Sequence, residues 1–229
     1  MRHPLKSIAL ILSFAASCTA FGAGGGQMPS PMPSQSRASM TPEDQARNDY
    51  NAGVRLVEKA DQLSADAMHQ ADERKAKKVL SKADQAYATA MKKFAHATEL
   101  QPSNYQAWNY VGYTNRKLGK FDAALAAYDH ALRLKPDYAE AIEYRGHAYL
   151  GLNRLADAKA AYLSLFAGNR QLAASLLTAM QQWVGAHRGD AAGVDGATVE
   201  SFASWVSERG MIASQTASLT REGAASAWH

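Results

Sequence analysis

The stretch Tyr105–Pro136 reads YQAWNYVGYTNRKLGKFDAALAAYDHALRLKP, and the stretch that begins at Ala139 reads AEAIEYRGHAYLGLNRLADAKAAYLSLFAGNR. When Tyr105 is aligned with Ala139, alanine, tyrosine, glycine and leucine recur at the same places in both stretches. A fixed period of about 34 residues is typical of stacked helical hairpins, in which each unit buries its apolar face against its neighbours. The chain is therefore predicted to be all-α and built from repeated helical hairpins.

Small residues at fixed places indicate where the paired helices touch. The first helix of each unit carries a glycine, Gly112 or Gly146, and the second helix carries an alanine at a constant separation from it. Glycine has no side chain and therefore allows two backbones to approach closely. Pro136 is expected to end a second helix because it has no backbone N–H. Gly119 and Gly151 lie near the expected turns, where a left-handed backbone is favourable for glycine.

A longer hairpin is predicted before the first full unit. Gly53 corresponds to Gly112, but its separation from its partner Ala90 (90 − 53 = 37) exceeds the separation in the later units (124 − 112 = 12). The intervening residues include no Pro or Gly, so they are expected to lengthen both helices, with the chain reversing near His69–Arg74 and Asp72 capping the returning helix. The inward face of that helix is expected to consist of Ala76, Leu80, Ala83, Tyr87, Ala90, Phe94 and Ala97.

The segment after the repeats is predicted to cover the open end of the stack. Residues 171–187 carry apolar side chains at helical spacing, and a stack of repeats requires such a covering helix. Residues 188–229 are expected to form a loosely attached C-terminal segment. Within it, residues 196–209 are predicted to form a short amphipathic helix, and the rest is small and polar.

The beginning of the chain has the pattern of a secretory signal peptide, expected over residues 1–23. Two basic residues precede a short apolar run, and small residues suited to cleavage follow it. The run is shorter than the roughly 20 residues that a membrane-spanning helix needs. Residues 24–40 are rich in Gly, Pro and Ser and are predicted to be a disordered linker. The alternative is acylation of Cys18, which would attach the protein to a membrane.

Composition and motifs favour neither catalysis nor nucleic-acid binding. The formal net charge of +4 arises from 25 Lys and Arg against 21 Asp and Glu in 229 residues, which is too balanced to predict a nucleic-acid partner. The sequence contains no HExxH, CxxC, phosphate-loop or GxSxG motif, so no enzymatic activity, catalytic residue, metal site or cofactor is predicted. The basic run Arg74–Lys82 is expected to be a solvated helix end. Trp183 and His187 lie one turn apart, and two residues do not make a site.

The repeated unit resembles the tetratricopeptide repeat, in which an aromatic residue, a glycine, alanines and a closing proline recur. The resemblance extends over a helical domain at residues 41–187. It implies an α-solenoid with a long-armed repeat at 41–104, two ordinary repeats at 105–138 and 139–170, and the covering helix at 171–187. The residues that match the family pattern are Trp108, Gly112, Phe121, Ala124, Tyr128, Ala131 and Pro136.

The resemblance also implies a concave groove lined by the first helix of each unit. Asn109, Tyr113 and Lys117 recur every four residues and so share a helix face. Tyr113 is expected to be the main anchor, since aromatic side chains dominate binding hot spots. Some family members hold a C-terminal carboxylate between Lys and Asn, but this chain has only Asn109 of that pattern. The residues implied to face the groove are Tyr50, Asn109, Tyr113, Arg116, Lys117, Glu140, Glu143 and His147.

Together, the repeats and the leader predict a non-catalytic protein-binding or scaffolding module of the bacterial cell envelope, located in the periplasm. Its partner is expected to be a protein or peptide lying in the groove. The alternative is an assembly factor for an envelope or pilus complex, attached to the outer membrane through Cys18. A membrane contact is expected only in that second case.

Overall fold

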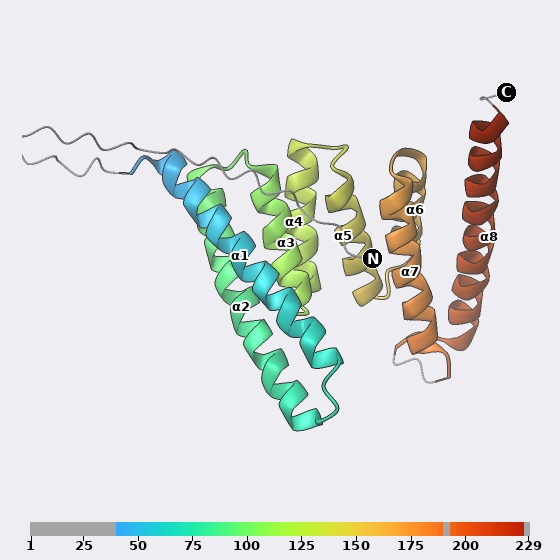
Figure 1. The fold of residues 1–229 in the computed structure, drawn as a ribbon, viewed down its shortest axis with the longest axis horizontal. Coiled ribbons are helices and arrows are strands. Elements are labelled where there is room, and N and C mark those ends of the chain that lie inside the picture. Colours follow the sequence, from blue (N-terminus) through green and yellow to red (C-terminus); the bar gives the residue numbers. More distant parts are fainter. Residues whose placement is uncertain (1–39, 190–192, 227–229) are drawn as a thin grey trace, which may run out of the picture. The chain divides into compact units, whose positions relative to one another are not determined.

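The computed structural model describes residues 40–189 and 193–226, and these residues contain eight α-helices (Figure 1). Helices that are neighbours in sequence pack against each other from α1 to α8, and α5 also touches α3 and α7. The expected signal peptide, Cys18 and the expected linker up to residue 39 lie outside the described residues. The helices are α1 (Pro42–Met68), α2 (Glu73–Leu100), α3 (Tyr105–Lys117), α4 (Phe121–Leu134), α5 (Ala139–Gly151), α6 (Leu155–Gly168), α7 (Arg170–His187) and α8 (Gly196–Ser226).

The first hairpin is elongated, as the sequence predicts. Helices α1 and α2 have 27 and 28 residues, whereas the helices of the next two hairpins have 13 or 14. The chain reverses over residues 69–72, and the Asp72 carboxylate accepts hydrogen bonds from the backbone N–H groups of Arg74 and Lys75 at 2.9 and 3.2 Å. Thr41 caps the start of α1 in the same way.

One residue of the expected inward face of α2 lies elsewhere. Leu80 is 44% exposed, whereas Val79 beside it is half-buried. Ala83 and Tyr87 are buried further along the helix. The inward face therefore includes position 79, which lies four residues before Ala83, and does not include position 80. The prediction of Leu80 as an inward residue is therefore wrong, because a rotation of one position moves a side chain by about 100° around a helix of 3.6 residues per turn.

Glycines lie against aromatic rings in the first two hairpins. A Cβ atom on Gly53 would lie 2.7 Å from the Phe94 ring, and one on Gly112 would lie 2.5 Å from the Tyr128 ring. The equivalence of Gly53 and Gly112 inferred from the sequence thus corresponds to an equivalent contact. Gly146 differs, since a Cβ atom there would lie 2.6 Å from Leu176 of α7.

The two equivalent turns use different residues. Gly119 after α3 has a left-handed backbone with φ of 72°, and Asn153, one repeat later, has φ of 57°. Gly151 does not take the left-handed conformation expected of it. It remains the last residue of α5, and a Cβ atom there would lie 2.5 Å from the Phe121 ring. Its small size therefore serves packing between hairpins.

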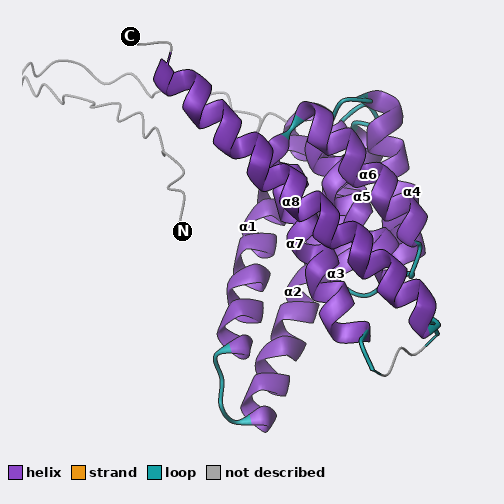
Figure 2. Cartoon of the chain, turned by 90° about the vertical axis from the view of Figure 1, so that its right-hand side faces the viewer, coloured by secondary structure: helices purple, strands orange, loops and turns teal. Residues whose placement is uncertain are grey.

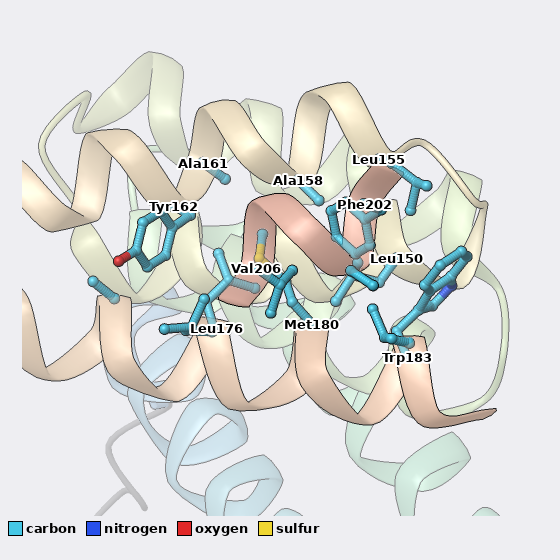
Figure 3. Close-up of a cluster of buried hydrophobic side chains, with 14 of the residues drawn as sticks. Leu150, Leu155, Ala158, Ala161, Tyr162, Leu176, Met180, Trp183, Phe202 and Val206 are labelled. Carbon is cyan, nitrogen blue, oxygen red and sulfur yellow. The ribbon is translucent and has the colours of Figure 1, made fainter. Parts of the chain in front are cut away.

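Helix α8 is longer than the short amphipathic helix expected at residues 196–209, and its first half packs against the hairpins. Helix α8 extends to Ser226 instead of ending near 209, in keeping with a run of small, helix-compatible residues that contains no proline. Its buried residues Phe202 and Val206 point into a cluster formed with α5, α6 and α7 (Figure 3). Phe202 is only 1% exposed. Residues 199–206 are therefore not loosely attached, because their apolar side chains complete the last hydrophobic core.

The contact between Gly112 and Tyr128 can be tested with a matched pair of substitutions. Gly112→Ala is expected to lower the free energy of unfolding by about 1–3 kcal/mol, because the added methyl group would overlap the tyrosine ring. Gly185→Ala is the control, since Gly185 lies inside α7 with no atom within 4 Å of an added Cβ. It is expected to raise the free energy of unfolding by about 0.5–1 kcal/mol through helix propensity. Urea denaturation measures both; the packing model is wrong if the two changes have the same sign.

Candidate functional site

Two of the predicted groove residues, Arg116 and His147, line a cleft between α3, α5 and α7. The cleft has a volume of about 450 Å³. Helix α7 supplies Trp183 and His187 to the same cleft, and Asn153 borders it from the turn after α5. Cationic, amide, aromatic and aliphatic groups therefore meet in one place. The remaining lining residues are Leu150, Gly151, Ala179, Gln182 and Ala186.

Trp183 and His187 form a stacked pair at one side of the cleft. Their ring centroids lie 3.9 Å apart with an interplanar angle of 14°. The His187 Nδ1 atom lies 2.8 Å from the Trp183 carbonyl oxygen, and the Trp183 Nε1–H donates to Asn153 Oδ1 at 3.2 Å. The orientation of both rings is thus fixed by hydrogen bonds before any partner binds.

His147 is paired with a buried acid. Its Nε2 atom lies 3.6 Å from Glu143 Oε1, and Glu143 is only 5% exposed. Glu143, one of the predicted groove residues, therefore does not face a partner directly. Its carboxylate instead lies within ion-pairing distance of the His147 ring that borders the cleft.

Arg116 is held by aromatic rings. Its guanidinium carbon lies 5.1 Å from the Tyr113 ring centroid and 5.6 Å from that of Tyr144, distances at which cation–π attraction operates. Burial, and then the nearby Glu143, raise the pKa of Tyr144 to about 12. The neutral tyrosine ring is therefore the form that supports the guanidinium at physiological pH.

Tyr113 and Lys117 are bound within the protein by Asp61 of α1. The Tyr113 hydroxyl donates to Asp61 Oδ1 and Oδ2 at 2.7 and 2.9 Å, and Lys117 Nζ lies 3.3 Å from Oδ1. Tyr87 of α2 also donates to Oδ1 at 2.5 Å. Burial first, and then the Asp61 charge, raise the pKa of Tyr113. Tyr113 is thus a fixed part of the junction between the long hairpin and α3, and its hydroxyl is already occupied.

The other predicted groove residues lie apart from the cleft-lining set. Tyr50 is half-buried and contacts the Phe94 and Tyr110 rings edge-on, each at 5.7 Å between centroids. Asn109 is 3% exposed, and its Oδ1 atom has no hydrogen-bond partner among the described residues. Glu140 is exposed in the first turn of α5. Asn109 therefore does not share an accessible surface with Tyr113 and Lys117, although the three have four-residue spacing.

Sequence reasoning missed Asn153, Trp183 and His187 as site residues. The four-residue spacing of Trp183 and His187 was a usable signal, because it places both on one face of α7. What joins them to the groove is the position of α7 beside α5, which brings residues far apart in the sequence to the same cleft. A sequence pattern within one helix does not contain that information.

The described residues offer no cluster of three or more His, Cys, Asp or Glu side chains that would hold a metal ion. None of the helices in the described ranges has the length and apolar character needed to cross a membrane. The chemistry available at the cleft is hydrogen bonding, ion pairing and aromatic contact. These are the interactions of a recognition surface.

The role of Asp61 can be tested by removing its carboxylate. Asp61→Ala is expected to lower the free energy of unfolding by about 1–3 kcal/mol, since two partly buried tyrosine hydroxyls lose their acceptor. Asp84→Ala, at an exposed position of α2, is the control and should change stability by less than about 0.5 kcal/mol. Urea denaturation followed by circular dichroism measures both. Equal effects would contradict the assignment of Asp61 as the link between α1, α2 and α3.

Comparison with known proteins gives a local match to one family. The TPR repeat family model matches residues 112–153, from α3 through α4 to the turn after α5. A comparison with curated proteins gave no match.

Solved structures of TPR domains are among those similar to the chain. The second TPR domain of the human RPAP3 protein, in complex with an HSP70 peptide, has 18% identity and a TM-score of 0.45, with 61% of this chain and 98% of that chain covered. The first TPR of Spaghetti (RPAP3), bound to an HSP90 peptide, has 21% identity, a TM-score of 0.38, and coverage of 55% and 94%. The Arabidopsis OM64 TPR domain has 18% identity, a TM-score of 0.40, and coverage of 59% and 96%. Those bound peptides are properties of the domains named. The recurring sequence unit and this match agree: residues 112–153 match the tetratricopeptide repeat family model, and the described helices form an all-α stack of hairpins.

Proposed function

We propose that the protein is a non-catalytic binding or scaffolding module that holds a peptide or helix of a partner protein in the cleft between α3, α5 and α7. The observation that carries the proposal is the composition of that cleft. Arg116, His147 and His187 offer charged or hydrogen-bonding groups, and Leu150 and Trp183 offer apolar surface. Binding sites combine a largely apolar wall with a few placed polar groups in this way.

Pre-organisation supports the same proposal. Arg116 is held by two tyrosine rings, and the Trp183 and His187 rings are fixed by hydrogen bonds to Asn153 and to the backbone. A site whose side chains are already ordered loses less conformational entropy when a partner binds. The cationic groups favour a partner segment that presents carboxylate or carbonyl oxygens.

We also propose that the protein acts in the bacterial cell envelope, in the periplasm. This location rests on the signal-peptide pattern of residues 1–23. The alternative, an outer-membrane assembly factor for an envelope or pilus complex, rests on Cys18. The intact mass of the protein isolated from the envelope distinguishes them. Loss of the whole signal-peptide segment is expected; an acylated Cys18 at the N-terminus would instead establish the alternative.

The proposal that a partner binds in the cleft can be tested by a substitution that fills the cleft and leaves the buried core unchanged. Ala186 lines the cleft and is exposed, so Ala186→Trp places an indole where the partner segment would lie. For a peptide selected against the wild-type protein from a random library, the dissociation constant is expected to rise by about tenfold or more, equivalent to about 1.4 kcal/mol. Ala126→Trp, on an exposed face of α4, is the matched control and should leave affinity unchanged. Fluorescence polarisation measures both affinities.

Two results would contradict the groove assignment. One is a selected peptide that binds the Ala186→Trp protein as tightly as the wild type. The other is equal weakening by both substitutions, which would indicate a general effect of added aromatic surface. Circular dichroism of each variant shows whether the helices are intact.

A further inference from the structure

The outer face of α2, near the free end of the long hairpin, carries a set of basic side chains that the proposed groove does not use. We define the basic face as the residues that surround one shallow hollow of about 510 Å³. All of them belong to α2, and most lie within its first three turns. They are Arg74, Lys77, Lys78, Ser81, Lys82 and Gln85.

We propose that the basic face docks onto an anionic phospholipid surface. Four cations border the hollow, and the Ser81 hydroxyl and the Gln85 amide add hydrogen-bond donors. Phosphate groups of lipid headgroups are ligands for such a set. Clusters of four to eight Lys and Arg on one helix face are typical of helices that bind anionic lipid.

The four cations are not neutralised within the protein. Among the described residues, Arg74, Lys77, Lys78 and Lys82 form no ion pair with a carboxylate within 4.0 Å. The neighbouring acid Asp72 accepts two backbone hydrogen bonds as the helix cap and lies 4.0 Å from Lys75. Glu73 and Asp84 also lie nearby in the sequence and reduce the local charge without removing the excess of cations.

The position of the basic face suits a flat partner. The buried residues Ala83 and Tyr87 turn α2 toward α1 and α3, and the basic residues occupy the opposite side of the helix. Both views show the free end of the α1–α2 hairpin extending past α3 (Figures 1 and 2). A surface approaching the outer side of α2 meets side chains from one helix, with only a shallow hollow among them, which favours a membrane over an extended peptide.

Exposed apolar side chains near the same end strengthen the lipid assignment. Met68, the last residue of α1, is 86% exposed, and Leu80, which lies between Lys78 and Lys82 in the sequence, is exposed at the edge of the basic face. Apolar groups beside cations are favourable at the boundary between headgroups and acyl chains. This contact does not require acylation of Cys18.

The test uses the full chain with vesicles of phosphatidylcholine alone or mixed with phosphatidylglycerol. The wild-type protein is expected to cosediment preferentially with the anionic vesicles, and the preference should fall as salt is added. Reversing three charges, in Lys77→Glu, Lys78→Glu and Lys82→Glu together, is expected to weaken partitioning into anionic vesicles by more than about tenfold.

The control reverses three exposed charges elsewhere, in Arg55→Glu, Lys59→Glu and Lys120→Glu together. Each triple variant changes the formal net charge from +4 to −2 (4 − 6), so the two differ only in where the charge lies. The control is expected to retain at least about half of the wild-type partitioning. Because both variants keep residues 1–39, any lipid contact made by that region is common to them.

Three outcomes would overturn the proposal. Equal weakening by the two triple variants would mean that overall charge decides binding. Equal binding of the wild type to neutral and anionic vesicles would mean that the four cations of the basic face do not determine binding. Binding to polyglutamate or to an oligonucleotide through the same lysines, without binding to anionic vesicles, would assign the basic face to a polyanionic macromolecule instead of lipid.

Discussion

The arrangement of the helices depends on aromatic rings that lie directly on glycines. Phe94 covers Gly53 and Tyr128 covers Gly112, so in the first two hairpins the missing side chain of the glycine makes room for the ring of the partner helix. This close approach sets the rotation of each helix about its axis and therefore decides which residues face the neighbouring hairpin. The Asp61 carboxylate of α1 and the Tyr113 hydroxyl of α3 meet across the two hairpins that are packed in this way.

Most of the polar residues nearest the candidate site are engaged in contacts within the protein and are not free to bind a partner. Tyr113 and Lys117 are engaged by Asp61, and Glu143 is buried beside His147. Most of the polar groups on these first helices thus serve to fix the helices and to orient the few groups that border the cleft. Specificity then depends on a small number of side chains held in place, among them Arg116.

The constant offset between the repeated stretches was sufficient to predict the hairpins, the long first pair and its reversal, because each depends on local helix signals such as the Asp72 cap. The offset could not predict the contacts between different hairpins. The Asp61–Tyr113 bond joins residues 52 positions apart, and Gly146 lies against Leu176 of α7 as well as against Ala161 of its own partner helix α6. Leu80 shows the same limit within one helix, since an error of one position in helix phase exchanges a buried for an exposed side chain.

Asn153 replaces glycine at a turn and gains a second use from it. Its left-handed backbone is less favourable than that of Gly119, but its side chain accepts a hydrogen bond from Trp183, 30 residues further on. In the preceding unit the equivalent turn only reverses the chain. Here the turn also connects one unit to the next through this hydrogen bond. The cooperativity of a solenoid is set by the coupling between neighbouring units. The change from glycine to asparagine at this one turn therefore favours cooperative unfolding of the C-terminal half.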